Sequence, residues 1–235
     1  MSTVLEAAGL AKVYQGEDGG TIEVLAGLDL TVAKGEFVAI TGASGVGKST
    51  LLHCLGALDR PTRGSVRLDG IDYAALAPSA MSALRNRRIG FIFQFHHLLR
   101  EFSALENVMM PLLIAGRPEA EAEDRAAAAL SAMGLDHRVS HRPAKLSGGE
   151  QQRVAVARAV VIEPSVVLAD EPSGNLDAHN ADRLHDLFAT LGERFGTAVI
   201  VVTHNPELAR RASRILTLVE GHLAPAHLPT GPLAA

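Results

Sequence analysis

Short hydrophobic runs rich in branched residues alternate with helical patterns along most of this chain. The runs "EFVAITG" (36–42), "SVVLADE" (165–171) and "TAVIVVTH" (197–204) are almost continuously apolar, and "KSTLLHCLGAL" after the first run predicts a helix. Strands of this kind are typical of a parallel sheet that is buried on both faces. The order of the elements therefore predicts an α/β fold.

The middle of the chain has a different pattern. Between about Leu105 and Val161 the strand pattern is lost, and "EAEAEDRAAAALSAMGL" is rich in strong helix formers, with Gly134 as its stop. We therefore predict that a helical region interrupts the α/β domain. The last residues, "LAPAHLPTGPLAA", are rich in proline and alanine, which predicts a loose tail.

Composition narrows the class of protein. With 235 residues, 47% of them hydrophobic, the chain forms one large domain, or one domain with an inserted subdomain. The net charge of -4 argues against a nucleic-acid binder. Cys54, as the single cysteine, cannot form an internal disulfide, which favours a reducing compartment and a small core residue. No run reaches the ~18 apolar residues of a membrane span, so we expect a soluble cytoplasmic chain.

The segment "GASGVGKST" matches the phosphate-binding pattern G-x-x-x-x-G-K-[ST] between a predicted strand and a predicted helix. Its glycines allow backbone N–H groups to approach phosphate oxygens, and the helix N-terminus adds a positive dipole. Lys48 can reach the β- and γ-phosphates, and the Ser49 hydroxyl can ligate Mg²⁺. The predicted nucleotide-binding residues here are Gly42, Ala43, Ser44, Gly45, Val46, Gly47, Lys48, Ser49 and Thr50.

Two carboxylates end the predicted strand segment "VVLADE" (166–171). Asp170 fits the Mg²⁺ side of the site, and Glu171 can orient or deprotonate the attacking water. Without the phosphate-binding loop they would be two exposed acids at a strand end. His204 ends another buried strand; such a histidine is often structural, but beside these groups we favour a contact with the γ-phosphate.

A second candidate anion site follows in "LSGGEQQR". Ser147 and Glu150 have the spacing of a capping box, and a helical pattern continues through Val154, Ala157 and Val161. Gly148 and Gly149 expose the first-turn amides, which can bind phosphate. An ordinary capped helix explains the same residues, and the motif alone leaves both interpretations open.

"LSGGEQQR" before "LADEP", with the phosphate-binding loop upstream, resembles the signature motif of ABC ATPases, and the resemblance covers nearly the whole chain. It implies an ABC ATP-binding domain over 1–224, with an N-terminal antiparallel β portion, a mostly parallel core sheet, a helical subdomain at about 95–160 and a loose tail over 225–235. It also implies ATP and Mg²⁺ as cofactors.

The same resemblance assigns further residues. Tyr14 takes the position of an aromatic residue against adenine, Gln94 that of the Q-loop glutamine near Mg²⁺ and the attacking water, Asp177 that of the D-loop, and His204 that of the switch histidine. In the family, two copies face each other head to tail. Ser147, Gly148 and Gly149 would then close over the ATP of the other copy.

A narrower resemblance is carried by "FQFHHLL", "ALENVMMPLLI", "GLDHRVSHRPAKLSGGE" and "DEPSGNLDAHNAD". Together they are similar to the ATP-binding subunits of bacterial lipoprotein-releasing transporters, the LolD type, whose near relatives are the MacB efflux and FtsE cell-division ATPases. Departures from the expected pattern stand at Arg100, Ser173 and Asn205. None of the three removes a group with an assigned chemical role.

This resemblance implies a peripheral ATPase on the cytoplasmic face of the bacterial inner membrane. Integral membrane subunits of the LolC/LolE type would be its partners and would handle the lipoprotein cargo, which this chain would meet only indirectly. An efflux or division ATPase is the alternative within the class. A soluble ABC protein acting on DNA or ribosomes is a different class, which usually carries paired cassettes, coiled coils or basic segments that this chain lacks.

The stretch "FHHLL" after Gln94 has three interpretations. Adjacent histidines are poor joint metal ligands, because neighbouring side chains on a helix or a strand do not face each other. In the family this stretch lies at a groove that receives a short helix of the membrane subunit. Apolar contacts would then come from Phe95, Leu98 and Leu99 and polar ones from His96 and His97. The remaining alternative is that these side chains fill the protein's own core.

Overall fold

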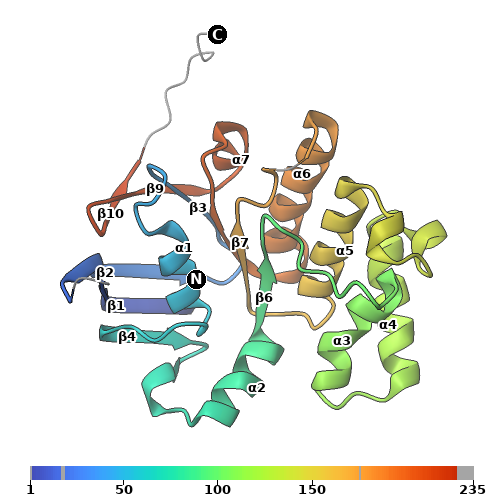
Figure 1. The fold of residues 1–235 in the computed structure, drawn as a ribbon, viewed down its shortest axis with the longest axis horizontal. Helices are drawn as coiled ribbons and strands as arrows, with labels where there is room; N and C mark the ends of the chain where they lie inside the picture. The colour runs from blue at the N-terminus through green and yellow to red at the C-terminus, as the bar shows by residue number, and fades with distance from the viewer. Residues whose placement is uncertain (1, 17–18, 175, 227–235) are drawn as a thin grey trace.

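Two β-sheets form the body of the molecule in the computed structural model, which describes residues 2–16, 19–174 and 176–226 (Figure 1). The first sheet is antiparallel, and its four strands lie in the order β2, β1, β4, β5. They are β1 (Thr3–Gln15), β2 (Thr21–Ala33), β4 (Arg63–Leu68) and β5 (Ile71–Asp72). This sheet is the antiparallel N-terminal portion that the resemblance implied.

The second sheet has six strands in the order β10, β9, β3, β8, β7, β6. Neighbours from β9 to β6 run parallel, and β10 pairs antiparallel with β9 at the edge. Its members are β3 (Phe37–Thr41), β6 (Ile89–Ile92), β7 (Val166–Asp170), β8 (Ala198–Val202), β9 (Arg214–Val219) and β10 (His222–Pro225). Because β3, β6, β7 and β8 are parallel, the loops after them meet at one edge of the sheet.

Alternate side chains of the parallel strands enter two different cores. Val38 and Ile40 of β3 pack with α1 (Lys48–Leu55) and with the antiparallel sheet, whereas Phe37 and Ala39 face the opposite side. This period of two explains why the strands are apolar throughout. Cys54 of α1 is fully buried in the first core, and burial raises the pKa of its thiol to about 11.

The opposite side of the parallel sheet is covered by α5 (Gly148–Val160) and α6 (Ala178–Phe195). Phe188 of α6 is fully buried and meets the ring of Phe37 edge-on, with 6.3 Å between ring centroids. Val156 of α5 belongs to the same cluster. The sheet is therefore buried on both faces, as its sequence pattern predicted.

Three helices form a second body beside the sheet (Figure 1). α3 (Ala104–Ile114) and α4 (Glu119–Ala132) pack on α5 around a separate apolar cluster. Gly134, with a φ of +68°, follows α4 at the predicted stop. Because α5 contributes to both this cluster and the core under the sheet, it joins the two bodies.

Further elements connect these parts. They are α2 (Pro78–Arg88), α7 (Pro206–Arg210) and single 3-10 turns at Tyr73–Ala75, Asp136–Arg138 and Pro143–Lys145. Among the described residues, no helix combines the length and the hydropathy of a membrane span.

The element predictions are confirmed in position and differ at the ends. The predicted strands are β3, β7 and β8, and the helix after β3 stops at Leu55 because Gly56 ends it and Ala57 turns to a φ of +57°. Pro225 pairs with Leu216 inside β10, so the last strand reaches the first residue of the predicted tail at 225–235. Residues 227–235 of that tail lie outside the described part of the chain.

Candidate functional site

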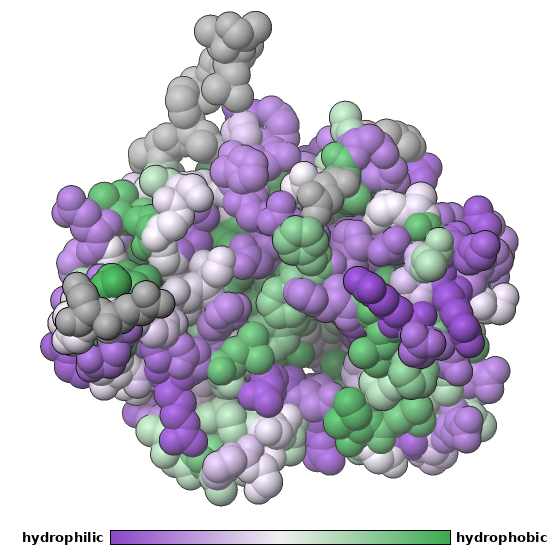
Figure 2. All heavy atoms as spheres, in the orientation of Figure 1, coloured by the Kyte–Doolittle hydropathy of each residue, from purple (hydrophilic) through white to green (hydrophobic). Residues whose placement is uncertain are grey.

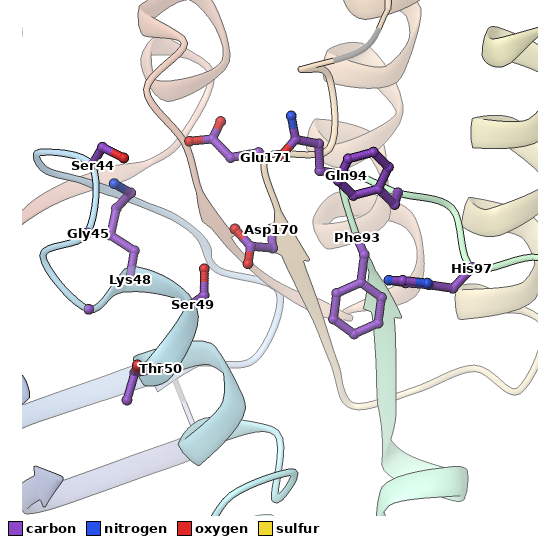
Figure 3. A pocket seen from close by; sticks show the side chains of 12 residues that line it. Ser44, Gly45, Lys48, Ser49, Thr50, Phe93, Gln94, His97, Asp170 and Glu171 are labelled. Carbon is purple, nitrogen blue, oxygen red and sulfur yellow. The ribbon is translucent and has the colours of Figure 1, made fainter. Parts of the chain in front are cut away.

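A cavity of about 430 Å³ lies where β6 and β7 end and α1 begins (Figure 3). Its walls come from three segments that are distant in sequence, namely 44–50, 93–97 and 170–171. The lining residues are Ser44, Gly45, Gly47, Lys48, Ser49, Thr50, Phe93, Gln94, Phe95, His97, Asp170 and Glu171. The structure therefore brings the predicted phosphate-binding loop, the two carboxylates and Gln94 to one place.

The loop before α1 is built on glycines whose backbone other residues rarely adopt. Gly42, Gly45 and Gly47 have φ values of +146°, +77° and +106°. A Cβ on Gly42 would lie 2.7 Å from the carbonyl oxygen of Leu218, and one on Gly47 would lie 2.6 Å from Val24. Ala43 and Val46 complete the loop, where the Val46 amide donates to the Ala43 carbonyl. The turn therefore requires glycine at these positions.

Lys48 is the first residue of α1 and points back over this loop. Its Nζ donates to the carbonyl oxygens of Gly42 at 2.8 Å and Ala43 at 2.9 Å. These bonds hold a positive charge at the helix N-terminus, where the helix dipole also favours anions. Ser49 follows on the same turn, and its hydroxyl faces the carboxylate of Asp170 across the cavity (Figure 3).

Glu171 follows the last residue of β7 and has an unusual backbone, with a φ of +43°. Its Oε1 accepts from the His204 backbone N–H at 3.0 Å and lies 2.8 Å from Nδ1 of the His204 ring. Its Oε2 is bonded by the Thr203 hydroxyl at 3.1 Å. The structure thus joins the two predicted residues Glu171 and His204, and Thr203 fixes the second carboxylate oxygen.

Gln94 lies on the loop between β6 and α3, opposite the phosphate-binding loop (Figure 3). Its amide nitrogen lies 3.1 Å from the position a Cβ would take on Gly174, in the segment after Glu171. The next residues are held from α5, since the guanidinium of Arg158 donates to the carbonyl oxygens of His96 and His97. Gln94 therefore lines the cavity from a loop that α5 anchors.

Ser147, Gly148 and Gly149 lie at the start of α5, outside this cavity. The predicted capping box is present: the Ser147 hydroxyl accepts from the Glu150 N–H, and the Glu150 carboxylate accepts from the Ser147 N–H at 2.7 Å. The backbone hydrogen bond from Ser147 lowers the pKa of Glu150. Ser147 and Gly148 are exposed, so the start of α5 can be reached from outside the chain.

Asp177 caps the next helix, α6, and also lies outside the cavity. Its carboxylate accepts from the backbone and side-chain N–H groups of Asn180. Asn180 in turn accepts from Arg153 of α5 at 2.9 Å, and its side chain lies against Gly149. Asp177 is therefore linked through Asn180 to the start of α5.

Tyr14 lies at the end of β1, partly exposed, and does not line the cavity. Its hydroxyl donates to Asp59 at 2.8 Å, and Lys12 bonds the other oxygen of Asp59 at 2.6 Å. Burial tends to raise the pKa of Asp59, but these two hydrogen bonds outweigh it and hold the pKa below its usual value. The Lys12 ammonium also lies 4.8 Å from the Tyr14 ring centroid, so the phenol is held in place on one side.

Three residues around the site were not found by sequence reasoning. Arg158 and Thr203 bond predicted site segments, and the buried Asn107 bonds the backbone of Leu99, Phe102 and Ser103. Arg158 and Asn107 are polar residues on otherwise apolar helix faces. This sequence pattern indicates that they are unusual, but it does not identify the groups to which they bond.

The donor set of the cavity fits a nucleotide triphosphate with a divalent cation. Lysine, helix-terminal amides and hydroxyls bind phosphate oxygens, whereas serine and aspartate oxygens are the ligands that Mg²⁺ prefers. The space beside Gly45 is open, because no atom lies within 4 Å of the position that a Cβ would take there. The cavity therefore offers room as well as the correct chemistry.

Comparisons with known proteins also point to a nucleotide-binding protein. A family profile described as ABC transporter matches residues 25–174. The lipoprotein-releasing system ATP-binding protein LolD of Geobacter metallireducens is 52% identical over 95% of this chain and 99% of its own. The protein of the same name from Pseudomonas fluorescens is 54% identical over 94% of this chain and 96% of its own.

Solved structures show the same architecture. The dimeric structure of MJ0796, a bacterial ABC transporter cassette, superimposes with a TM-score of 0.87 at 38% identity, covering 93% of this chain and 96% of that one. A dimeric post-hydrolysis state of MJ0796 bound to ADP and Pi gives a TM-score of 0.86 over the same shares. The predicted ABC ATPase fold is thereby confirmed, and the chain belongs to the ABC transporter family as an ATPase of the LolD group.

Proposed function

We propose that the cavity binds ATP with Mg²⁺ and that different residues bind the phosphates and the metal ion. Lys48 and the loop amides from Gly42 to Thr50 hold the β- and γ-phosphates. Ser49, Asp170 and Gln94 hold Mg²⁺, which would neutralise charge on the phosphates when bound. The support is the convergence of these groups on one cavity and the bonds that keep Lys48 over the loop.

Glu171 is the general base for the attacking water, and His204 and Gln94 position the reacting groups. Glu171 is suited to this because its carboxylate is fixed by Thr203 and His204 at the cavity wall. A base held in one orientation reacts more readily than a mobile one. Tyr14, at the end of β1, provides an aromatic ring for adenine, and its hydroxyl is held by a hydrogen bond to Asp59.

The complete site requires a second copy of the chain. Ser147, Gly148, Gly149 and Asp177 present accessible or capping groups away from the chain's own cavity, so they fit a head-to-tail dimer in which each signature segment closes over the partner's nucleotide. The similar cassette MJ0796 is dimeric in its solved structures. In such a dimer, each hydrolysing site takes its base from one chain and its signature amides from the other.

In the cell, the chain powers a membrane complex that releases outer-membrane-directed lipoproteins. The observation that carries this assignment is the identity of 52–54% with LolD proteins over nearly the full length of both chains. Integral subunits of the LolC/LolE type would supply the membrane spans and handle the lipoprotein, with this chain on the cytoplasmic face of the inner membrane. The MacB-like and FtsE-like complexes are the alternative.

An exposed apolar surface lies where such subunits would dock. Phe95 is 69% exposed, Leu99 42%, and Ile114 at the end of α3 67%. Figure 2 shows hydrophobic residues gathered over the α3 side of the molecule. Phe95 and Leu99 are four residues apart in one loop, and large exposed apolar side chains of this kind are typical of a protein interface.

Copurification tests the assignment to a lipoprotein-releasing complex. The tagged chain carrying Glu171→Gln is purified from detergent-solubilised membranes of its own source, and its partners are identified by mass spectrometry. Copurified membrane subunits with large periplasmic domains that release lipoproteins with ATP, once they are reconstituted in vesicles with the wild-type chain, would support the proposal. Subunits that instead move macrolides or bind division proteins would contradict it and favour the alternative.

A further inference from the structure

Arg158 connects the signature helix to the loop that carries Gln94. It lies on α5, and one of its terminal nitrogens donates to the carbonyl oxygen of His97 at 2.9 Å while the other donates to that of His96 at 2.8 Å. A planar guanidinium is suited to bonding two neighbouring acceptors at once, which an ammonium cannot reproduce. Arg158 therefore fixes two consecutive peptide groups that begin two residues after Gln94.

The charge of Arg158 serves no ion pair with a carboxylate in the described part of the chain. Burial lowers its pKa, which shows that its position costs hydration energy. Burying a guanidinium with only backbone carbonyls as partners costs free energy. This cost is offset when the carbonyl oxygens would otherwise lack hydrogen-bond donors. The side chain thus acts on the conformation of the loop and not on surface charge.

The loop needs such support. Residues 93–103 form no regular helix or strand, and His97 has a φ of +46°, a conformation that is unfavourable for a residue with a Cβ. The His97 ring lies edge-on to Phe93, with 5.3 Å between centroids, and both rings line the ATP cavity. Losing the bonds to His96 and His97 would let this turn relax and displace Gln94 from the cavity.

The helix that carries Arg158 is itself held firmly. α5 packs into the core under the sheet through Val156 and Ala159 and into the helical cluster through Val154 and Ala157. Its first residues, next to Ser147, are the signature segment. Arg158 lies about 16 Å further along the helix, at 1.5 Å per residue. A movement of α5 as a rigid rod would therefore reach the Q-loop of the same chain through Arg158.

We propose that Arg158 is a positioning residue for hydrolysis, which acts through the peptide groups of His96 and His97 to keep Gln94 in the ATP cavity of its own chain. The inference rests on the proposed function, since it uses the role of Gln94 and the head-to-tail dimer. It makes a directional claim: a lesion at Arg158 impairs the site on its own phosphate-binding loop and spares the partner's site, to which the same chain contributes only Ser147 and its neighbours.

Directed dimers test this claim. Arg158→Met keeps the aliphatic stem and removes the donors, and Glu171→Gln silences hydrolysis at a chain's own site while allowing dimer closure. In the first arm, Arg158→Met chains are mixed with excess Glu171→Gln chains. In the second arm, wild-type chains are mixed with excess chains carrying both substitutions. The reference is wild type mixed with excess Glu171→Gln, and ATP hydrolysis is measured per active chain.

The proposal predicts a loss of about 10- to 100-fold in the first arm, because misplacing a reacting group by about 1 Å costs this much. The second arm stays within about twofold of the reference. KM for ATP is unchanged in the first arm, kcat falls, and the Mg²⁺ concentration for half-maximal rate rises. Equal losses in both arms, or a loss confined to the second, would overturn the proposal, as would an unchanged first arm.

Two controls separate folding from positioning. Arg125→Met removes an arginine of α4 that also bonds a backbone carbonyl, that of Val161, far from the cavity, and should leave the Mg²⁺ dependence unchanged. Arg158→Lys restores one donor and should recover part of the rate. If Arg158→Met lowers the melting temperature but Arg158→Lys, with normal stability, shows full activity and normal Mg²⁺ dependence, the two-carbonyl bond is not required and the proposal is wrong.

The composite site is tested in the same assay by a different mixture. Wild-type chains with excess chains carrying Ser147→Arg and Glu171→Gln should lose hydrolysis if signature residues act in trans. Should that mixture remain active, the composite site fails. Arg158 is then judged by homodimers alone: Gln94→Ala and Arg158→Met should be non-additive in kcat if they act through one loop, and full additivity would overturn the proposal.

Discussion

The carboxylate of Glu171 and the ring of His204 lie in direct contact, with 2.8 Å between Oε1 and Nδ1. The same carboxylate also accepts from the His204 backbone N–H and the Thr203 hydroxyl. The residue after β7 is thus tied to the residues after β8, which is the neighbouring parallel strand. This arrangement fixes a carboxylate at the cavity wall, and the position of this proposed base depends on the ends of both strands.

Glu171→Gln should abolish ATP hydrolysis and retain ATP binding. The amide has the same shape and can keep a bond to Thr203, but it cannot accept a proton, and losing a general base costs about 10²- to 10⁴-fold in rate. Steady-state hydrolysis and equilibrium binding of a fluorescent ATP analogue measure the two effects. Glu163→Gln is the matched control, because Glu163 is exposed and pairs with Arg125 away from the cavity. Near-normal turnover of the Glu171 variant would remove Glu171 from its role.

Ser147→Arg should block turnover and leave ATP binding by the separate chain intact. The hydroxyl caps α5 at an exposed position outside the chain's own cavity, so the bulky side chain obstructs only a partner.

Lys48→Ala should weaken nucleotide binding itself, because the cation over the phosphate-binding loop is lost.

Mixing these two variants checks the head-to-tail geometry. A dimer of one Ser147→Arg chain and one Lys48→Ala chain holds one site with both lesions and one site with neither, so activity should reappear on mixing. ATPase rates of the mixture are compared with the sum of the separate variants. A rate equal to that sum would contradict the composite site.

The parts of the site that follow from local sequence could be predicted. The phosphate-binding loop, the strand that ends at Asp170 and the capping box of Ser147 and Glu150 are each set by residues within a few positions of one another. The box forms with both predicted hydrogen bonds. The apolar runs also predicted a doubly covered parallel sheet, because every side chain of β7 and β8 is buried except that of Asp170 at its end, which is partly exposed.

The remaining contacts depend on tertiary partners that no local pattern names. Arg158 bonds residues that are 61 and 62 positions away, and Thr203 reaches Glu171 across 32 positions. The segment "FHHLL" shows the same limit. Its composition allowed a core or a surface, and the structure divides it: Leu98 packs against the helical cluster, whereas Phe95, His97 and Leu99 are exposed.

That division gives a matched pair of variants for the docking surface. Phe95→Ser changes a side chain that is 69% exposed, so it should leave the stability of the chain nearly unchanged and weaken copurification with membrane subunits. Leu98→Ala removes packing in the helical cluster and should lower the free energy of unfolding by about 1–3 kcal/mol. Urea unfolding and pull-down measure the two properties. Normal assembly of the Phe95 variant would show that the segment is not the docking surface.

His185 on α6 should make the folded chain less stable as the pH falls below about 6.5. Its side chain is 1% exposed, and neither ring nitrogen has a hydrogen-bond partner in the described structure. Burial lowers its pKa, as does Arg211, and the opposing effect of Asp182, Asp186 and Glu207 is smaller. The ring therefore stays neutral in the folded chain at a pH where the unfolded chain takes up a proton.

Proton uptake by the unfolded state alone draws the equilibrium toward unfolding as the pH drops, by up to about 1.4 kcal/mol per pH unit for one group. His185→Leu removes this group, so its free energy of unfolding should fall less between pH 7 and pH 5 than that of the wild type, as measured by urea titration at each pH. His96, whose pKa burial also lowers, contributes with the same sign in both proteins and cancels in the comparison. Leu184→Ala, a buried neighbour on α6, should lower stability equally at both pH values. An unchanged pH slope in His185→Leu would mean that this ring is protonated in the folded chain as readily as in the unfolded one.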